Sequence, residues 1–218
     1  MICAVVLAAG RSQRMGTHKM LLDCGGKPLI AHVVDQLLAA KLDPAWHGHL
    51  AHDSRAGCPC HIYVVTGHNP EAVAGALAAR TVTLVANPDY EQGMLSSVRR
   101  GFAAMPETCR AVLVTLGDQP AITPDLVNQL IDAHNKTQKG IVVPVHNNRR
   151  GHPTLIAAKY RHAVMTQYDN VGLRGLLHDH PDDVLELPAP DLDVTIDLDT
   201  PDDYARHLRN KTHPPHTT

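Results

Sequence analysis

The sequence predicts a single α/β domain whose mostly parallel sheet is covered by helices on both faces. Short apolar runs alternate with helical patterns over the first two thirds of the chain. The runs at residues 2–7 and 111–116 are apolar without interruption, which is typical of strands buried on both faces. A length of 218 residues suits one domain of this class and leaves no room for two full-sized ones.

The elements are expected in a regular order along the chain. After the first strand at residues 2–7 comes a polar loop with glycines, and then a helix that Pro28 opens, because proline lacks the N–H that the first turn leaves unpaired. Further strands are expected at residues 62–65, 82–85, 111–116 and 141–145, with helices at residues 71–79, 95–104 and 123–134. After Gly151 the pattern is looser: residues 152–156 and 194–196 fit strands, and residues 173–178 and 201–209 fit helices.

One domain is expected to span residues 1–210, with a loop insertion inside it and a short tail after it. The insertion, residues 43–61, is rich in histidine and cysteine and interrupts the connection between the first helix and the second strand. Its Cys58-Pro59-Cys60-His61 spacing is unusual for a structural zinc site, so an unliganded surface loop is favoured over a metal site. Residues 211–218 are expected to be disordered, since their side chains offer little to bury.

Composition excludes several classes of function. A net charge of −2 argues against a general attraction to nucleic acid or to an anionic membrane. No stretch approaches the roughly 20 apolar residues that a membrane span needs. The five cysteines are odd in number and irregularly spaced, which favours reduced thiols and a cytoplasmic protein over a disulfide framework.

The loop after the first strand is the strongest candidate site. Ligands of doubly wound sheets bind at the carboxyl ends of strands, and glycines such as Gly10 let backbone N–H groups approach an anion. Arg11, Arg14 and Lys19 add positive charge, a combination that suits a triphosphate. The spacing matches neither the dinucleotide fingerprint nor the P-loop, and an ordinary glycine turn with solvated basic residues is the alternative.

Two aspartates are candidate metal ligands. Asp118 follows the strand at residues 111–116 and would point into the same crevice as the first loop; hard cations such as Mg²⁺ prefer carboxylate and phosphate oxygens. As a polar residue at a strand end, it is expected outside the core, so that its substitution changes stability little. Asp199 follows a second short apolar run. The alternatives are that Asp118 caps a helix or turn, and that Asp199 or Thr200 caps the helix that Pro201 opens.

Five motifs occur in an order that resembles the molybdenum cofactor nucleotidyltransferases, in particular their cytidylyltransferase branch. They are Leu-Ala-Ala-Gly-x-Ser-x-Arg-Met-Gly-x-x-Lys at residues 7–19, Gly-Met-Leu-Ser-Ser-Val at 93–98, Asp-Gln-Pro at 118–120, Gly-His-Pro at 151–153 and Asp-Leu-Asp-Thr-Pro at 197–201. The resemblance runs to about residue 205 and implies a three-layer nucleotide-binding fold similar to other nucleotidyltransferases and glycosyltransferases. It is partial at residues 169–174, where this family more often reads Gly-Asp-x-Gly-Ala-Arg, and the loop at 43–61 looks like an insertion.

The resemblance also implies roles for individual residues. The nucleotide would be held by Leu7, Ala8, Ala9, Gly10, Arg14, Lys19, Ser96, Ser97 and Asp118. Asp118 and Asp199 would bind Mg²⁺, while Arg14, Lys19 and Asp118 would take part in catalysis. The segment at residues 169–174, with Arg174 at its end, would face the pterin substrate together with Gly151, His152 and Pro153.

The implied reaction is the transfer of CMP from CTP to the phosphate of molybdopterin, with release of pyrophosphate. It needs positioning and charge neutralisation but no general base, because the attacking phosphate is already ionised. CTP is expected over GTP, because the guanylyl branch usually has glycine where this chain has Ala9, and the methyl group takes space that a purine could use. The alternative is that Ala9 is simply a small residue that strand–helix packing requires.

Three other functions stay open at this point. They are a guanylyltransferase, a nucleotidyltransferase acting on a sugar or polyol phosphate, and a non-catalytic carrier of the molybdenum cofactor. The pair Asp118 and Asp199 disfavours the carrier, which has no need to bind Mg²⁺. A molybdenum hydroxylase is the expected recipient of the product.

Overall fold

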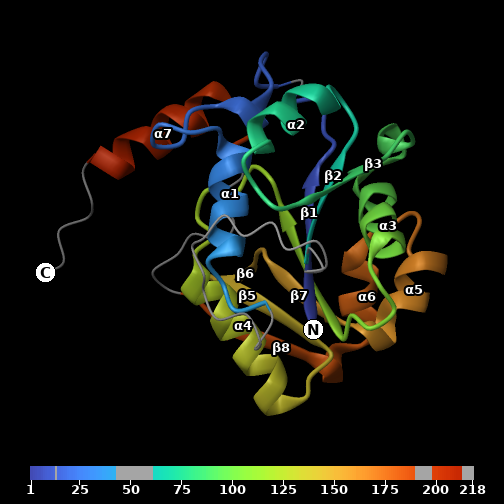
Figure 1. The fold of residues 1–218 in the computed structure, drawn as a ribbon. Helices are drawn as coiled ribbons and strands as arrows, with labels where there is room; N and C mark the ends of the chain where they lie inside the picture. Colours follow the sequence, from blue (N-terminus) through green and yellow to red (C-terminus); the bar gives the residue numbers. More distant parts are fainter. Residues whose placement is uncertain (13, 43–60, 190–197, 213–218) are drawn as a thin grey trace, which may run out of the picture.

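The computed structural model describes residues 1–12, 14–42, 61–189 and 198–212 (Figure 1). The predicted insertion at residues 43–61 therefore lies outside the described residues except for His61, and so do the expected strand at 194–196 and residues 213–218. Within the described ranges, no helix is long and apolar enough to cross a membrane. In the same ranges Cys3, Cys24 and Cys109 are buried and form no disulfide.

Eight strands form one sheet in the order β3-β2-β1-β4-β7-β5-β6, with β8 paired to β5. Their bounds are β1 Ile2–Ala8, β2 Ile62–Thr66, β3 Thr83–Ala86, β4 Ala111–Leu116, β5 Ile141–His146, β6 Arg149–Arg150, β7 Thr154–Ala157 and β8 Val184–Pro188. Strands β3, β2, β1 and β4 are parallel to one another, and β8 is parallel to β5. Strand β7 runs antiparallel to both β4 and β5, and β6 runs antiparallel to β5. The predicted mostly parallel sheet is confirmed.

Helices cover both faces of this sheet, as predicted (Figure 1). Their bounds are α1 Leu29–Leu38, α2 Pro70–Leu77, α3 Met94–Ala104, α4 Pro124–Thr137, α5 Arg161–Thr166, α6 Leu173–Asp179 and α7 Pro201–Thr212. Alternate side chains of β1 enter two different cores: Ala4 and Val6 pack with α1, α2 and α4, whereas Val5 and Leu7 pack with α3, α5 and α6. This two-sided burial is why β1 reads as an uninterrupted apolar run.

Several boundaries differ from those predicted. Pro28 precedes α1 in an extended conformation and pairs with Asp23 in an isolated β-bridge, so it does not open the helix. The strand expected at residues 152–156 begins only at Thr154, after the cis His152–Pro153 peptide. Helix α7 reaches Thr212, two residues into the predicted tail. The structure adds β6, β8 and α5, which the sequence pattern did not predict.

A third, small core joins the two ends of the chain. Met15, Cys24 and Leu29, from the loop after β1 and the start of α1, pack with Leu198, which precedes α7. The hydroxyl of Tyr204 in α7 donates a hydrogen bond to the carbonyl of Asp23 at 2.8 Å. This core fixes the segment around residue 199 beside the carboxyl ends of β1 and β4.

Candidate active site

A cavity of about 210 Å³ opens where β1 and β4 end. Six of the residues predicted to contact the nucleotide line it: Leu7, Ala9, Gly10, Lys19, Ser97 and Asp118. Strands β1 and β4 are adjacent and parallel, and Gly117 N donates to Leu7 O at 3.0 Å, which draws the two strand ends together. The position agrees with the rule that ligands of such sheets bind at the carboxyl ends of strands.

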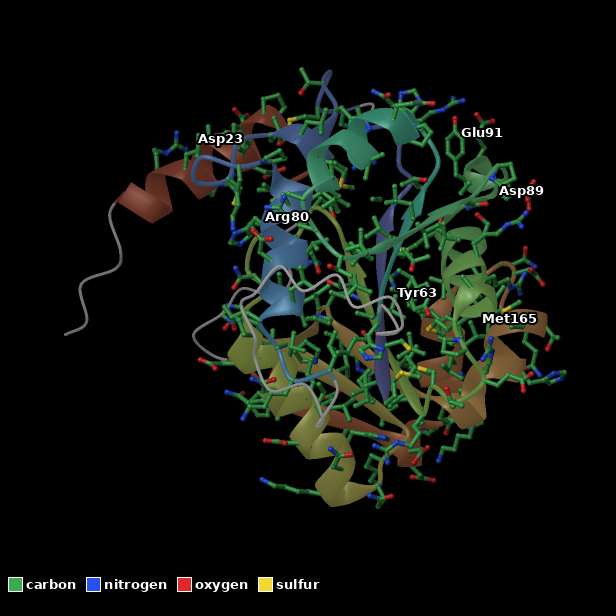
Figure 2. The ribbon with its side chains drawn as sticks, viewed as in Figure 1. Asp23, Tyr63, Arg80, Asp89, Glu91 and Met165 are labelled. Atoms are coloured by element: carbon green, nitrogen blue, oxygen red, sulfur yellow. The ribbon has the colours of Figure 1, made fainter. Side chains whose placement is uncertain are left out.

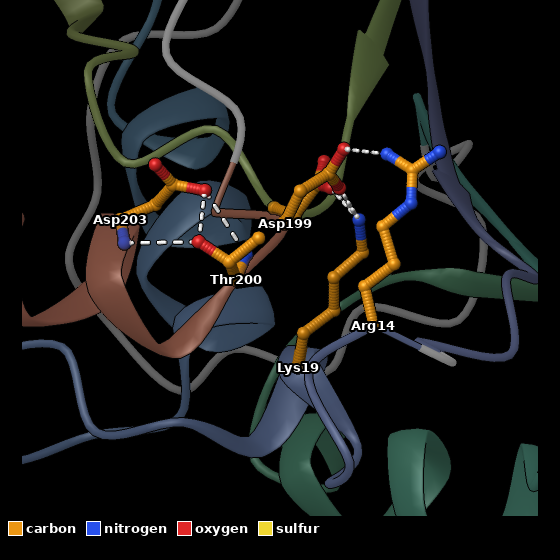
Figure 3. A network of polar contacts seen from close by, with 6 residues as sticks. Arg14, Lys19, Asp199, Thr200 and Asp203 are labelled. Atoms are coloured by element: carbon orange, nitrogen blue, oxygen red, sulfur yellow. Dashed lines mark hydrogen bonds and ion pairs between the residues drawn. The ribbon is translucent and has the colours of Figure 1, made fainter.

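Lys19 is the centre of the charged end of this cavity (Figure 3). Its ammonium contacts the carboxylates of both Asp118 and Asp199, the latter at 2.9 Å, and its side chain is 14% exposed. Arg14 Nη1 lies 3.6 Å from Asp199 Oδ2. Burial alone would lower the pKa of Lys19, but the charges and hydrogen bonds of the two aspartates outweigh burial and raise it. Lys19 is therefore a fixed positive charge at physiological pH.

Gly117 places Asp118 at this point. A Cβ at position 117 would come within 2.8 Å of Ile30 Cδ1 and 2.9 Å of Met20 Sδ, so only glycine lets the end of β4 pass there. Asp118 is not the cap of α4, because Thr123 holds that position and its hydroxyl accepts from Leu126 N at 3.2 Å. Asp118 is also 5% exposed, which corrects the expectation that it lies outside the core.

Thr200 and Asp203 explain why Asp199 is available to the cavity. The Thr200 hydroxyl accepts from Asp203 N at 3.2 Å, and the Asp203 carboxylate accepts from Thr200 N at 3.0 Å (Figure 3). This reciprocal pair is a capping box at the start of α7. Because Thr200 is the cap, the carboxylate of Asp199 is left to meet Lys19 and Arg14.

The two aspartates fit a divalent cation. Both carboxylates reach the same ammonium, and paired carboxylates around one cation are a donor set that Mg²⁺ accepts. In the part of the chain that the structure describes, no group of three or more His, Cys, Asp or Glu side chains gathers in a way that could hold a metal. An ion held by this pair would therefore take its other ligands from phosphate oxygens and water, as Mg²⁺ does beside nucleotides.

The wall opposite the charged end is largely uncharged and was not predicted. Met20, Tyr90, Gly93, Met94 and Leu116 complete the cavity lining. The Tyr90 ring packs so close to Gly67 that a Cβ there would lie 2.6 Å from the ring carbon Cγ. The Arg11 guanidinium lies 5.6 Å from the centroid of the Tyr90 ring and pairs with Glu91, which Figure 2 labels. Gly67 directly follows β2, but no pattern in the sequence pairs it with Tyr90.

Ser96 and Ser97 have different positions despite being neighbours. Ser97 is 4% exposed and lines the cavity. Ser96 is not part of that lining among the described residues; its hydroxyl is within 2.8 Å of Gly93 O and 3.0 Å of Asp89 O and supports the turn before α3. The side chain of Ala8 likewise faces the core beneath α1. Asn87, which the sequence analysis missed, bonds to both serines.

The residues expected to face the pterin lie apart from the cavity lining. Gly151, His152 and Pro153 lead into β7, where His152 Nδ1 lies 3.3 Å from Val114 O. Arg174 is exposed on α6. Within the described residues, none of the four lines the cavity, and their role remains a prediction.

Comparisons with known proteins agree with this geometry. Residues 4–184 match the family described as "MobA-like NTP transferase domain". The "Molybdenum cofactor cytidylyltransferase" of Escherichia coli is 29% identical over 207 residues, which cover 93% of each chain. Among solved structures, Rv0371c from Mycobacterium tuberculosis has a TM-score of 0.78 at 28% identity and covers 95% of this chain and 97% of its own. A structure of Rv0371c in complex with manganese has a TM-score of 0.74 at 25% identity, with 95% and 98% covered.

Proposed function

The chain belongs to the family of MobA-like NTP transferase domains and is a nucleotidyltransferase, and from this premise we propose that it transfers CMP from CTP to the phosphate of molybdopterin. Pyrophosphate is the other product. The observation that carries the proposal is the position of Lys19 between Asp118 and Asp199 in a cavity at the ends of β1 and β4. The choice of CTP and molybdopterin is supported by the activity that the name of the Escherichia coli relative states.

The bonds that change are the same whichever nucleotide is used. An oxygen of the acceptor's phosphate forms a bond to the α-phosphorus of the triphosphate. The bond from that phosphorus to the oxygen bridging to the β-phosphate breaks, and pyrophosphate leaves with the electron pair. No proton has to be removed, because the attacking phosphate is ionised at neutral pH. The protein's task is therefore to position the two phosphates and to neutralise their charge.

Lys19 and Arg14 are suited to the leaving group. Both carry positive charge at the cavity, and Lys19 is partly buried, where a charge acts more strongly than in water. Backbone N–H groups around Ala9 and Gly10 can approach phosphate oxygens, because a Cβ at Gly10 would meet nothing within 4 Å and the loop surface there is open. These groups would stabilise the charge that builds on the departing pyrophosphate.

Asp118 and Asp199 would hold Mg²⁺. When bound, the ion neutralises phosphate charge as a Lewis acid. Both carboxylates contact Lys19 in the structure, so the ammonium has to exchange them for phosphate oxygens when the nucleotide enters. The manganese complex of Rv0371c supports a divalent ion in a protein of this fold.

CTP is proposed over GTP because of Ala9. Ala9 lines the cavity, is 6% exposed and directly follows β1. A methyl group at this point reduces the space for a purine. A cytoplasmic location and a molybdenum hydroxylase as recipient of the product complete the proposal; they rest on the thiol content and the sequence resemblance alone.

The test is pyrophosphate release by the full-length chain with Mg²⁺, molybdopterin and each of the four ribonucleoside triphosphates in turn. We expect release with CTP that requires both the acceptor and the divalent ion. A preference for GTP would make the protein a guanylyltransferase. Release with a sugar or polyol phosphate in place of molybdopterin would identify a different acceptor. Binding of molybdopterin without release from any triphosphate would identify a carrier.

A further inference from the structure

Besides the Lys19 cluster, the cavity is lined by a second polar side chain, Ser97 of α3. We propose that Asn87 is a positioning residue that makes the Ser97 hydroxyl a hydrogen-bond donor to the nucleoside part of the bound nucleotide. The inference rests on the proposed function of the cavity as a nucleotide site. It is carried by the hydrogen bonds of three neighbouring side chains, Asn87, Ser96 and Ser97.

The orientation of the Asn87 amide is determined by its backbone neighbour. Its Oδ1 lies 3.0 Å from Asp89 N, and because an N–H can only donate, the amide oxygen has to face it. The amide nitrogen therefore faces the two serines, at 2.9 Å from Ser96 Oγ and 3.0 Å from Ser97 Oγ. Each of its two hydrogens is donated to one hydroxyl. Asn87 is 1% exposed, and its own N–H donates to Thr66 O at 2.8 Å, so it is held firmly.

The two serine hydroxyls differ in whether their own hydrogen has an acceptor. Ser96 accepts from Asn87 and donates its hydrogen to a carbonyl of the same turn, Gly93 O or Asp89 O. Ser97 also accepts from Asn87, but its own hydrogen has no acceptor among the residues that the structure describes. Ser97 lines the cavity and is 4% exposed. A buried donor without an acceptor is uncommon in proteins, and a ligand in the cavity would supply one.

The surroundings of Ser97 indicate which part of a nucleotide it meets. Tyr90, Met94 and Ala9 share this cavity and carry no charge, which suits a flat base and a ribose. The phosphates are attracted instead to Lys19 at the charged end. The Ser97 hydroxyl therefore donates to an acceptor atom of the base or the ribose, and not to a phosphate oxygen.

Asn87→Asp is the sharpest test, because it keeps the size of the side chain and removes its donors. A carboxylate still accepts from Asp89 N but also accepts from both hydroxyls, which turns the Ser97 hydrogen away from the cavity. Ser97→Ala removes the hydroxyl itself. Calorimetry with CTP and Mg²⁺, in the absence of acceptor, should show each variant binding roughly 5- to 100-fold more weakly than the parent.

Three further measurements separate this role from a structural one. The double variant should bind CTP no more weakly than the weaker single variant, because both changes remove the same donor. Affinity for pyrophosphate should stay within about twofold of the parent, since the phosphates are assigned to Lys19. Asn135→Asp, the same chemical change at an exposed position of α4, should have no effect on either ligand.

The inference is overturned if either single variant binds CTP as the parent does. It is also overturned if Asn87→Asp weakens the Ser97→Ala variant further, or lowers pyrophosphate affinity as much as CTP affinity, because the substitution would then act through its charge or through the fold. A parent that binds pyrophosphate but none of the triphosphates would instead contradict the proposed function.

Discussion

The Nζ atom of Lys19 lies 2.9 Å from Oδ1 of Asp199, although 180 residues separate the two in the chain. Asp118 contacts the same ammonium from the end of β4. Three distant segments therefore meet at one partly buried charge, and a change in any of them is expected to alter the electrostatics of the cavity.

Asp118→Asn should lower kcat at saturating Mg²⁺ by about a hundredfold or more, because it removes a charge that would hold the metal. The side chain is 5% exposed and paired with Lys19, so we also expect a loss of about 1–2 kcal/mol in the free energy of unfolding. Pyrophosphate release and urea unfolding measure the two effects. Glu107→Gln, at an exposed position, is the matched control and should change neither. Turnover within about threefold of the parent would exclude the metal role.

Ala9→Gly should relax the preference for CTP over GTP. Ala9 lines the cavity, and a difference of one methyl group is worth about 1–3 kcal/mol, or roughly tenfold to two-hundredfold in kcat/KM. The measurement is kcat/KM for both triphosphates with molybdopterin, in the parent and in the variant. An unchanged ratio would mean that Ala9 serves packing only. A parent that prefers GTP would contradict the cytidylyl assignment while leaving a nucleotidyltransferase.

Gly101→Ala and Gly75→Ala should shift stability in opposite directions. A Cβ at Gly101 in α3 would lie 2.4 Å from Val5 Cγ1 of β1, so alanine there should cost about 1–3 kcal/mol. A Cβ at Gly75 in α2 would meet nothing within 4 Å, so alanine should stabilise by about 0.5–1 kcal/mol through helix propensity. Denaturant midpoints measure both. Adding Val5→Ala to the Gly101 variant should recover part of its loss; a double variant that is less stable still would contradict the close-packing argument.

Asp35→Asn should destabilise the protein near neutral pH but not in acid. Asp35 in α1 accepts two hydrogen bonds from Arg80, at 2.6 and 3.0 Å, and one from Lys27 at 2.5 Å (Arg80 is labelled beside α1 in Figure 2). Burial alone would raise the pKa of Asp35, but these two partners outweigh burial and hold it below its ordinary value of 3.8. Because the folded-state pKa is depressed, the stabilisation is present above the unfolded value and is lost as pH falls through the folded one.

The carboxylate of Asp35 is about one third exposed, so the expected effect at pH 7 is modest, about 1 kcal/mol. Urea unfolding of the parent and of Asp35→Asn should show this difference shrinking as the pH is lowered below about 4. A difference that stays constant down to the acid limit of folding would show that Asp35 acts through packing and not through its charge.

The parts of the fold that could be predicted are those whose burial produces a recognisable pattern of apolar residues in the sequence. Strands β1 and β4 are buried on both faces and read as apolar runs. Strand β8 is half exposed and includes Glu186 and Pro188, so neither alternation nor an apolar run indicates it. Strand β6 consists of two exposed arginines, and α5 is only six residues long, too short for a helical period to show.

The same distinction applies to the site. Lys19, Asp118 and Asp199 are charged residues at strand ends or in loops, where chemistry is the simplest reason for their presence. Asn87 and Tyr90 could not be found in this way. The importance of Asn87 lies in which hydrogens it donates, and the position of Tyr90 depends on Gly67 in another loop. Both depend on tertiary contacts that leave no pattern in the sequence.

During synthesis, the loop after β1 leaves the ribosome long before the segment that completes it. The small core of Met15, Cys24 and Leu29 is incomplete until Leu198 has been synthesised. The ion pair of Lys19 with Asp199 likewise cannot form before Asp199 is present. A chain that ends before Leu198 contains the residues of β1, β2 and β4 but lacks Asp199, so Asp118 is the one member of the aspartate pair that it can offer to Lys19. The cluster therefore cannot form until Leu198 and Asp199 have been synthesised, and fragments that end before Leu198 are expected to be inert.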